Sequence, residues 1–135
     1  MRLVADANVL LSAVLGGRAK AILEHPKIEL VVTAEVTFAE VQEYAAQLAI
    51  KKRLPLDLVL LTMASLPVKI VAREEYASSI AKASRRIGKR DPDDVDLLAL
   101  ALHLKLPVWS NDNDFEDAGV EWHTTAQLLK KLLIV

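Results

Sequence analysis

The chain has 135 residues, which is enough for one domain with a hydrophobic core, and we predict a single domain over residues 1–135. Its 53% content of hydrophobic residues excludes a mainly disordered chain, and its formal net charge of −1 excludes binding of nucleic acid through an overall positive field. The absence of cysteine excludes disulfide frameworks, thiolate zinc sites and cysteine nucleophiles. With no apolar run of membrane-spanning length and no signal peptide, a cytoplasmic protein is expected.

Apolar patterns along the chain predict strands and helices in turn. Short apolar runs predict strands, and apolar residues three or four positions apart predict helices, whose ends are indicated by Pro, Gly and capping residues. The expected strands are residues 2–5, 28–32, 68–71, 106–109 and 121–123. The expected helices are residues 9–14, 18–25, 33–52, 56–65, 74–87, 92–104 and 125–132.

The third expected helix carries the most detailed prediction. Thr33 is expected to cap its amino end, because a threonine hydroxyl can accept from the first free backbone N–H groups. Its buried face is expected to include Val41, Tyr44, Ala45 and Leu48.

This alternation predicts an α/β fold of three layers, α/β/α, with a central parallel sheet of about five strands. In such sheets ligands bind at the carboxyl ends of the strands. Four acids are expected at this edge. Asp6 follows the first strand, Glu40 lies early in the helix after the second strand, and Asp94 and Asp112 flank the fourth.

The stretch from Asp91 to Asp94 begins the helix before the fourth strand. Asp91 precedes Pro92 as an N-cap precedes a proline in the first turn, and Asp93 and Asp94 then lie near the positive end of the helix dipole. Asp94 also continues an apolar stripe, which directs its carboxylate inward, where it needs a partner. The stripe consists of Leu97, Leu98, Ala101 and Leu104.

Each acid taken singly is also explained as a helix cap or a turn residue. Together they are harder to explain, since two carboxylates ~4 Å apart repel by roughly 4 kcal/mol at an effective dielectric near 20. A bound cation or a raised pKa must compensate for this repulsion. Oxygen ligands favour Mg²⁺ or Mn²⁺, and such ions can polarise a phosphodiester and activate water. Metal-assisted phosphodiester hydrolysis is therefore the predicted reaction.

Four stretches resemble the PIN domain, the fold of the VapC toxins of toxin–antitoxin pairs. They are VADANVLLSAVL at residues 4–15, TFAEVQEY at 37–44, DPDDVDLLALAL at 91–102 and VWSNDNDF at 108–115. The resemblance implies a Mg²⁺- or Mn²⁺-dependent endoribonuclease that acts on RNA, is paired with a cognate antitoxin and forms a homodimer. The tail at residues 132–135 is a candidate for the dimer interface.

The resemblance also implies roles for individual residues. The metal-binding and catalytic acids fall on Asp6, Glu40, Asp94 and Asp112. The supporting residues are Asn8, Asp93, Ser110 and Asp114. Two alternatives stay open: Asp93 in place of Asp94, and Glu43 in place of Glu40.

A basic run lies directly before the acidic stretch. It consists of Lys82, Arg85, Arg86, Lys89 and Arg90. Such runs are often solvated helix faces, but here the run could neutralise RNA phosphates beside an acidic centre.

Two other functions are compatible with the sequence. The first is a non-catalytic RNA-binding or scaffold protein on the same fold, which loss of one acid would indicate. The second is phosphate hydrolysis through an aspartyl-phosphate on Asp6, which usually needs an acid two residues later, where this chain has Asn8.

Overall fold

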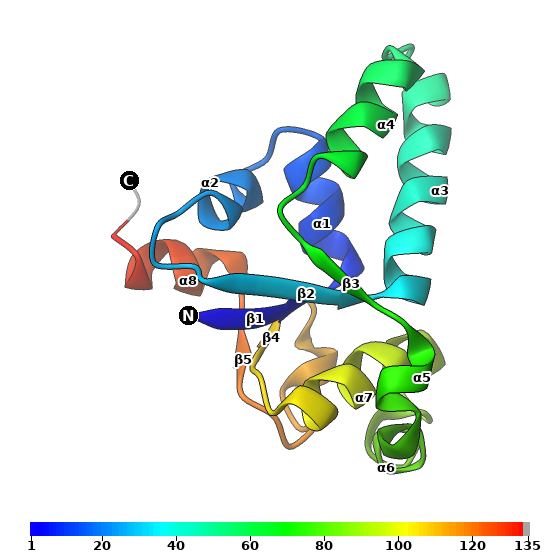
Figure 1. Ribbon diagram of the computed structural model, residues 1–135, viewed down its shortest axis with the longest axis vertical. Helices are drawn as coiled ribbons and strands as arrows, with labels where there is room; N and C mark the ends of the chain where they lie inside the picture. The colour runs from blue at the N-terminus through cyan, green and yellow to red at the C-terminus, as the bar shows by residue number, and fades with distance from the viewer. Residues whose placement is uncertain (134–135) are drawn as a thin grey trace.

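The computed structural model describes residues 1–133, whose centre is a five-stranded sheet in the order β3-β2-β1-β4-β5 (Figure 1). Every neighbouring pair of strands is parallel. The strands are β1 (Arg2–Ala5), β2 (Leu30–Ala34), β3 (Lys69–Val71), β4 (Val108–Trp109) and β5 (Trp122–His123). All five strands lie within two residues of the segments expected from the sequence, so the parallel sheet is confirmed.

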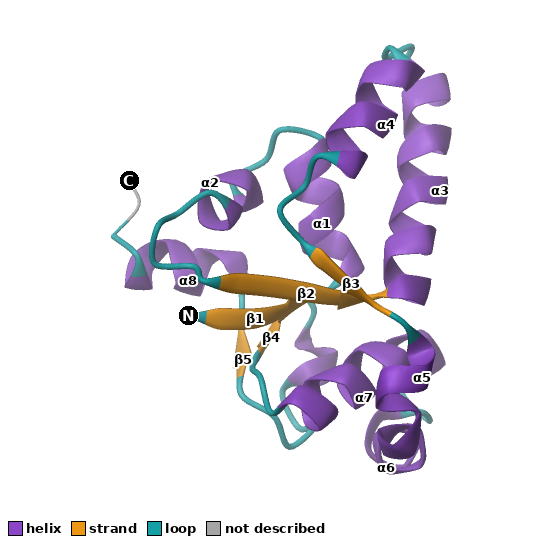
Figure 2. Ribbon diagram, in the orientation of Figure 1, coloured by secondary structure: helices purple, strands orange, loops and turns teal. Residues whose placement is uncertain are grey.

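Eight α-helices and three 3₁₀ turns connect and cover the strands among the described residues (Figure 2). The first four helices are α1 (Ala7–Val14), α2 (Ala19–Leu23), α3 (Glu35–Lys51) and α4 (Leu56–Ala64). The other four are α5 (Arg73–Tyr76), α6 (Ile80–Ile87), α7 (Val95–Leu104) and α8 (Thr125–Lys131). The 3₁₀ turns are η1 (Ala77–Ser79), η2 (Pro92–Asp94) and η3 (Asn113–Phe115). Among residues 1–133 no helix is both long and apolar enough to cross a membrane.

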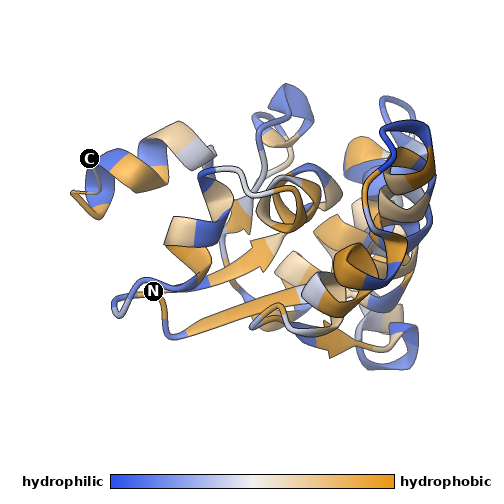
Figure 3. Ribbon diagram, turned by 90° about the horizontal axis from the view of Figure 1, so that it is seen from above, coloured by the Kyte–Doolittle hydropathy of each residue, from blue (hydrophilic) through white to orange (hydrophobic). Residues whose placement is uncertain are grey.

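Helices cover both faces of the sheet, because successive residues of a strand point to opposite faces. Leu3 packs in the core beneath α1 to α4 and α8, whereas Val4 packs in a second core with α5, α6 and α7. Figure 1 shows these two helical layers on opposite sides of the strands. Figure 3 shows apolar strands, with hydrophilic residues concentrated in loops and outer helix turns. The predicted three-layer α/β/α architecture is confirmed.

Two predictions for the long helix are wrong. Thr33 is the fourth residue of β2 rather than a helix cap, and its buried hydroxyl donates to the carbonyl oxygen of Ala5 at 2.8 Å. Helix α3 begins two residues later, at Glu35. Val41 and Ala45 are buried as expected, but the side chain of Tyr44 is 53% exposed and therefore lies outside the core.

The helix expected over residues 74–87 is broken into α5, η1 and α6. Tyr76 lies at the break, fully buried, and its hydroxyl donates to Asp96 Oδ2 at 2.6 Å. Ser78 and Ser79 follow, and serine favours local turns over helix interiors. The anchored tyrosine and these serines together account for the break, and α6 still ends before Gly88 as predicted.

The strand order opens a crevice between β1 and β4. Consecutive strands leave this pair in opposite directions, which is where parallel sheets bind ligands at their carboxyl ends. Ala5 is paired with Trp109, so Asp6 and Ser110, which follow these two residues, emerge side by side. The topology thus brings together residues more than 100 positions apart in the chain.

Candidate metal centre

Asp6 is held rigidly at the end of β1. Its Oδ1 accepts from the backbone N–H of Ala7 at 2.7 Å, which caps α1. Its Oδ2 accepts from the hydroxyl of Ser110 at 2.6 Å and from the amide of Asn8 at 3.2 Å. Asp6 is buried, and this burial raises its pKa although the bonds from Ser110 and Ala7 oppose the rise. Three donors therefore fix this carboxylate before any ligand arrives.

Ser110 and Asn8 connect the loops that follow β1 and β4. The Ser110 hydroxyl oxygen accepts from the backbone N–H of Asp112 at 3.0 Å, and Asn8 Oδ1 accepts from the backbone N–H of Asn111 at 3.2 Å. The indole N–H of Trp122 also donates to the Ser110 carbonyl oxygen at 2.9 Å. The two residues thus hold the loop that carries Asp112 against the start of α1, next to Asp6.

Four carboxylates converge beside this network. They belong to Asp91, Asp94, Asp112 and Asp114, and one oxygen from each lies within 4.8 Å of the corresponding oxygens of the other three. Asp94 is buried and the others are half-buried. Side chains from two separated loops, the start of α7 and the end of β4, form the group.

The sequence predicts Asp91 only as a helix cap, and Asp91 does accept from the backbone N–H of Asp93 at 3.0 Å. The structure places it in the carboxylate group as well. The spacing of Asp91 and Asp94 could have predicted this, because residues three positions apart lie on the same side of a helical turn. Asp93 is exposed and stands outside the group, so of the two alternatives the structure brings Asp94 to the cluster.

Asp94 is the one acid of this group with a buried oxygen, Oδ2, that lacks a hydrogen-bond partner among the described residues. Burial, followed by the negative charges of Asp6 and Asp91, raises the pKa of Asp94 to about 8. A buried, unpartnered carboxylate oxygen among like charges is what a divalent cation would compensate.

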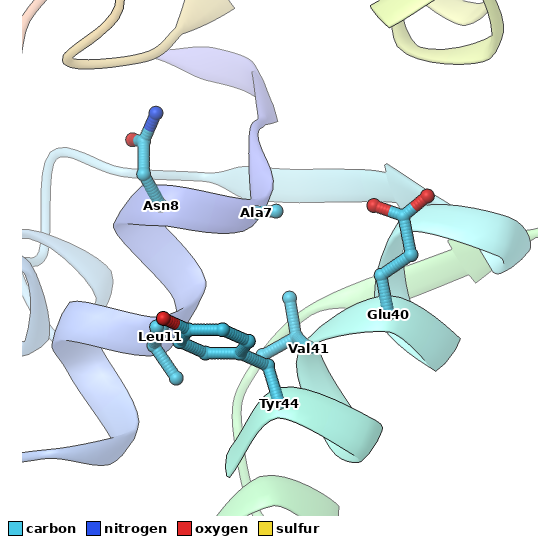
Figure 4. A pocket seen from close by; sticks show the side chains of 6 residues that line it. All are labelled: Ala7, Asn8, Leu11, Glu40, Val41 and Tyr44. Atoms are coloured by element: carbon cyan, nitrogen blue, oxygen red, sulfur yellow. The ribbon is translucent and has the colours of Figure 1, made fainter. Parts of the chain in front are cut away.

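Glu40 lies apart from the four carboxylates. It projects from α3 towards the amino end of α1, near Ala7 (Figure 4). Shielding of its carboxylate from water raises the pKa of Glu40, with further contributions from the charges of Asp93 and Asp6. Glu40 therefore shares the electric field of the site without belonging to the close group. Glu40 and its alternative, Glu43, are both exposed residues of α3, and of the two only Glu40 lines the pocket shown in Figure 4.

The basic run has mixed surroundings. Arg90 Nε lies 3.2 Å from Asp114 Oδ1, so this arginine offsets part of the acidic charge. Arg86 donates to the carbonyl oxygens of Ala118 at 3.1 Å and of Gly119 at 3.4 Å, which fixes the segment before β5. The remaining three members, Lys82, Arg85 and Lys89, are exposed.

The donor set fits a hard divalent cation. One buried oxygen of Asp94 has no partner among the described residues, and all four carboxylates bring an oxygen within short range of one another. Mg²⁺ and Mn²⁺ prefer such ligands, whereas zinc sites are usually built with Cys or His. The arrangement can hold a metal, and the chemistry that it then supports is activation of water beside a phosphate.

Several solved structures share this fold. VapBC2 from Rickettsia felis superposes with a TM-score of 0.72 at 12% identity, covering 92% of this chain and 98% of that one. FitAcB from Neisseria gonorrhoeae superposes with a TM-score of 0.63 at 22% identity, covering 92% of this chain and 98% of that one. VapC20 from Mycobacterium tuberculosis superposes with a TM-score of 0.59 at 17% identity, covering 89% of this chain and 96% of that one. No match was found among curated protein sequences.

The family model described as PIN domain matches residues 4–133, nearly the whole chain. The match spans Asp6 at the end of β1, the start of α7 and the loop after β4. The chain therefore belongs to the PIN domain family.

Proposed function

We propose that the protein is a Mg²⁺- or Mn²⁺-dependent endoribonuclease and the toxin of a toxin–antitoxin pair. The observation that carries this proposal is the buried Asp94 oxygen, which has no partner among the described residues and lies within a group of four carboxylates. A stably folded protein rarely retains such an arrangement without a cation to compensate for it.

Asp6, Asp94 and Asp112 are the proposed metal ligands. Asp91 and Asp114 complete the group of four carboxylates. Once bound, a divalent ion supplies charge that polarises the phosphodiester and favours ionisation of water. The protein's part is positioning. The Ser110 and Ala7 bonds hold Asp6 in one orientation, and Arg90 holds Asp114 at the edge of the group.

Asp6 and Glu40 both lie outside the group of four carboxylates. Asp6 adjoins the group through Ser110, whose hydroxyl also accepts from the Asp112 backbone N–H, whereas Glu40 stays a predicted ligand on the resemblance alone. Asp93 keeps its predicted supporting role, for which its backbone N–H, donated to the Asp91 carboxylate, gives a basis. The exposed cations Lys82, Arg85 and Lys89 are proposed to neutralise phosphates on either side of the cleaved bond.

The choice of RNA and of a protein partner rests on similarity to other proteins. The VapC20 structure is described as a sarcin-ricin loop cleaving toxin, and a related structure from Klebsiella pneumoniae is a toxin–antitoxin complex. By analogy we propose RNA as the substrate, a cognate antitoxin, a homodimer and a cytoplasmic location.

A surface suitable for a partner lies on α4. Several of its leucines are exposed, namely Leu56, Leu58, Leu60 and Leu61. Adjacent exposed apolar side chains indicate a protein interaction surface. The tail suggested from the sequence is less suitable: Leu132 is buried within the chain, Leu133 is exposed, and residues 134–135 lie outside the described residues.

The proposed function is tested by metal binding and cleavage on the same samples. Mg²⁺ and Mn²⁺ are titrated into the wild type and Asp94→Asn by calorimetry, and both proteins are then incubated with RNA with and without EDTA. We expect binding and EDTA-sensitive cleavage in the wild type only. Wild-type protein that binds RNA but neither binds metal nor cleaves would contradict the enzyme assignment and favour the non-catalytic RNA-binding function.

A further inference from the structure

A small pocket lies between α1 and α3, beside the carboxylates. Its volume is about 180 Å³, and it is lined by Ala7, Asn8, Leu11, Glu40, Val41 and Tyr44. Figure 4 shows the ring of Tyr44 reaching from α3 towards Leu11, with Glu40 at the opposite end. The pocket thus has an apolar floor and polar groups at its rim.

Tyr44 is the unusual residue of this pocket. The sequence pattern places it on the buried face of α3, yet its side chain is 53% exposed, while its neighbours Val41 and Ala45 are buried. A half-exposed ring supported by aliphatic side chains is a flat surface on which another aromatic ring can stack. RNA offers such rings whenever its bases are unpaired.

The pocket adjoins Asp6, one of the proposed metal ligands. Asn8 lines the pocket, and its amide donates to Asp6 Oδ2 and to the Ser110 hydroxyl oxygen, both at 3.2 Å. Ala7 also lines it and donates its backbone N–H to Asp6. A base in the pocket would therefore belong to a nucleotide adjoining the phosphate held at the carboxylates.

We propose that this pocket binds one unpaired nucleobase of the RNA substrate next to the cleaved bond, with the base stacked on the ring of Tyr44. The proposal rests on the ribonuclease assignment and adds to it a binding site for one base of the substrate. A single planar ring system suits a short pocket bounded by two helices, and the polar rim of Asn8 and Glu40 suits the polar edge of a base. The enzyme would accordingly cut single-stranded or looped RNA, because a paired base cannot enter.

The test maps cleavage sites on a single-stranded RNA oligonucleotide pool with randomised sequence, in Mg²⁺ or Mn²⁺. The wild type is compared with Tyr44→Phe, which keeps the aromatic ring, and with Tyr44→Leu, which keeps an apolar side chain but removes the ring. Ile50→Ala is the matched control, since Ile50 is an exposed apolar residue near the far end of α3.

We expect a nucleotide preference at one position beside the cut in the wild type, Tyr44→Phe and Ile50→Ala. Tyr44→Leu should flatten that preference and lower single-turnover kcat/KM by roughly tenfold, the effect of losing one stacked base. Replacing the base at that position by an abasic ribose should slow the wild type similarly and leave Tyr44→Leu unaffected.

Equal preferences and rates in the wild type and Tyr44→Leu, with no effect of the abasic ribose, would overturn the base-binding proposal while leaving the nuclease intact. Loss of inhibition by an antitoxin in Tyr44→Leu, with RNA cleavage unchanged, would also overturn it and assign the pocket to a protein segment. Failure of the proposed function itself is recognised separately, because then the wild type cleaves no member of the pool.

Discussion

Asp6 and Asp94 are similarly buried at the same sheet edge, with 6% and 8% of their surfaces exposed, but their surroundings are opposite. Three hydrogen-bond donors orient the two oxygens of Asp6. The Oδ2 of Asp94 has no partner within the described residues. One carboxylate is fixed by the protein, whereas the other has an oxygen that is available to a cation.

This difference follows from where the two residues stand. Asp6 lies at the centre of the sheet, where the loop after β4 supplies Ser110 as a donor. Asp94 lies in the turn before α7, where its neighbours are other acids. Burial alone therefore does not show how a carboxylate is used, and the donors around it are more informative.

The largest expected effect comes from replacing each aspartate by asparagine. Both Asp6→Asn and Asp94→Asn should lower cleavage by more than the roughly 100-fold that a supporting residue contributes, since each removes a proposed ligand. Their effects on stability without metal should be opposite. Asp6→Asn should cost about 1–3 kcal/mol, because an amide N–H₂ cannot accept from the donors that Asp6 serves.

Asp94→Asn should instead raise the metal-free Tm by about 4 °C or more, since it removes a repelled charge and provides a donor to the neighbouring carboxylates. Thermal unfolding in EDTA measures both shifts, with wild type as the reference. A loss of Tm in Asp94→Asn would mean that this carboxylate is compensated within the chain, and the contrast with Asp6 would disappear.

The pH dependence of metal-free stability should report Asp94. Its pKa rises from an ordinary value of 3.8 to about 8 on folding, so between these values the folded protein holds a proton that the unfolded chain releases. The free energy of unfolding contributed by this group is therefore fully present below about pH 4 and is lost as the pH rises through about 8. Denaturant titrations across this range in EDTA should show the decline.

Asp94→Asn is the control for the pH series, and it should flatten the decline. Metal affinity should change in the reverse direction, increasing with pH up to about 8, because a ligating carboxylate must lose its proton. A decline of equal size in the variant would assign the titration to another acid.

A smaller effect is expected from Ser110→Ala. This change removes the hydroxyl that donates to Asp6 and accepts from the Asp112 backbone N–H, so Asp6 would resemble Asp94 more closely. Cleavage should fall by about 10- to 100-fold, the usual effect of removing an outer-shell residue. Ser65→Ala, an exposed serine beyond α4, should leave cleavage unchanged. Full activity in Ser110→Ala would show that preorganisation of Asp6 is dispensable.

The smallest effect is expected from charge reversal on α6. Lys82→Glu with Arg85→Glu should reduce the slope of log affinity against log salt by up to about 1.4, since each neutralised phosphate of single-stranded RNA contributes roughly 0.7. The charge-matched control is Lys51→Glu with Lys52→Glu at the far end of α3. Equal slopes in the two variants would identify the α6 cations as a solvated face.

Much of this architecture could be predicted from the sequence. Apolar runs separated by Pro, Gly and capping residues placed every strand and most helix boundaries, because those signals are local. The last helix begins at the predicted residue, Thr125, where Thr124 and Gln127 form a capping box. The cap predicted at Thr33 is wrong because its hydroxyl donates to the carbonyl oxygen of Ala5 on the neighbouring strand, a partner that only the folded sheet provides.

The sequence by itself determined which acids stand at strand ends and helix starts, since strand and helix periodicity fix the side of an element on which a residue lies. Only the tertiary structure decided that Asp91 joins the carboxylates, that Glu40 stands apart and that Arg90 compensates Asp114. The physical reason is distance. Charge compensation acts over a few ångströms, and the strand order, rather than the spacing along the chain, decides which loops come that close.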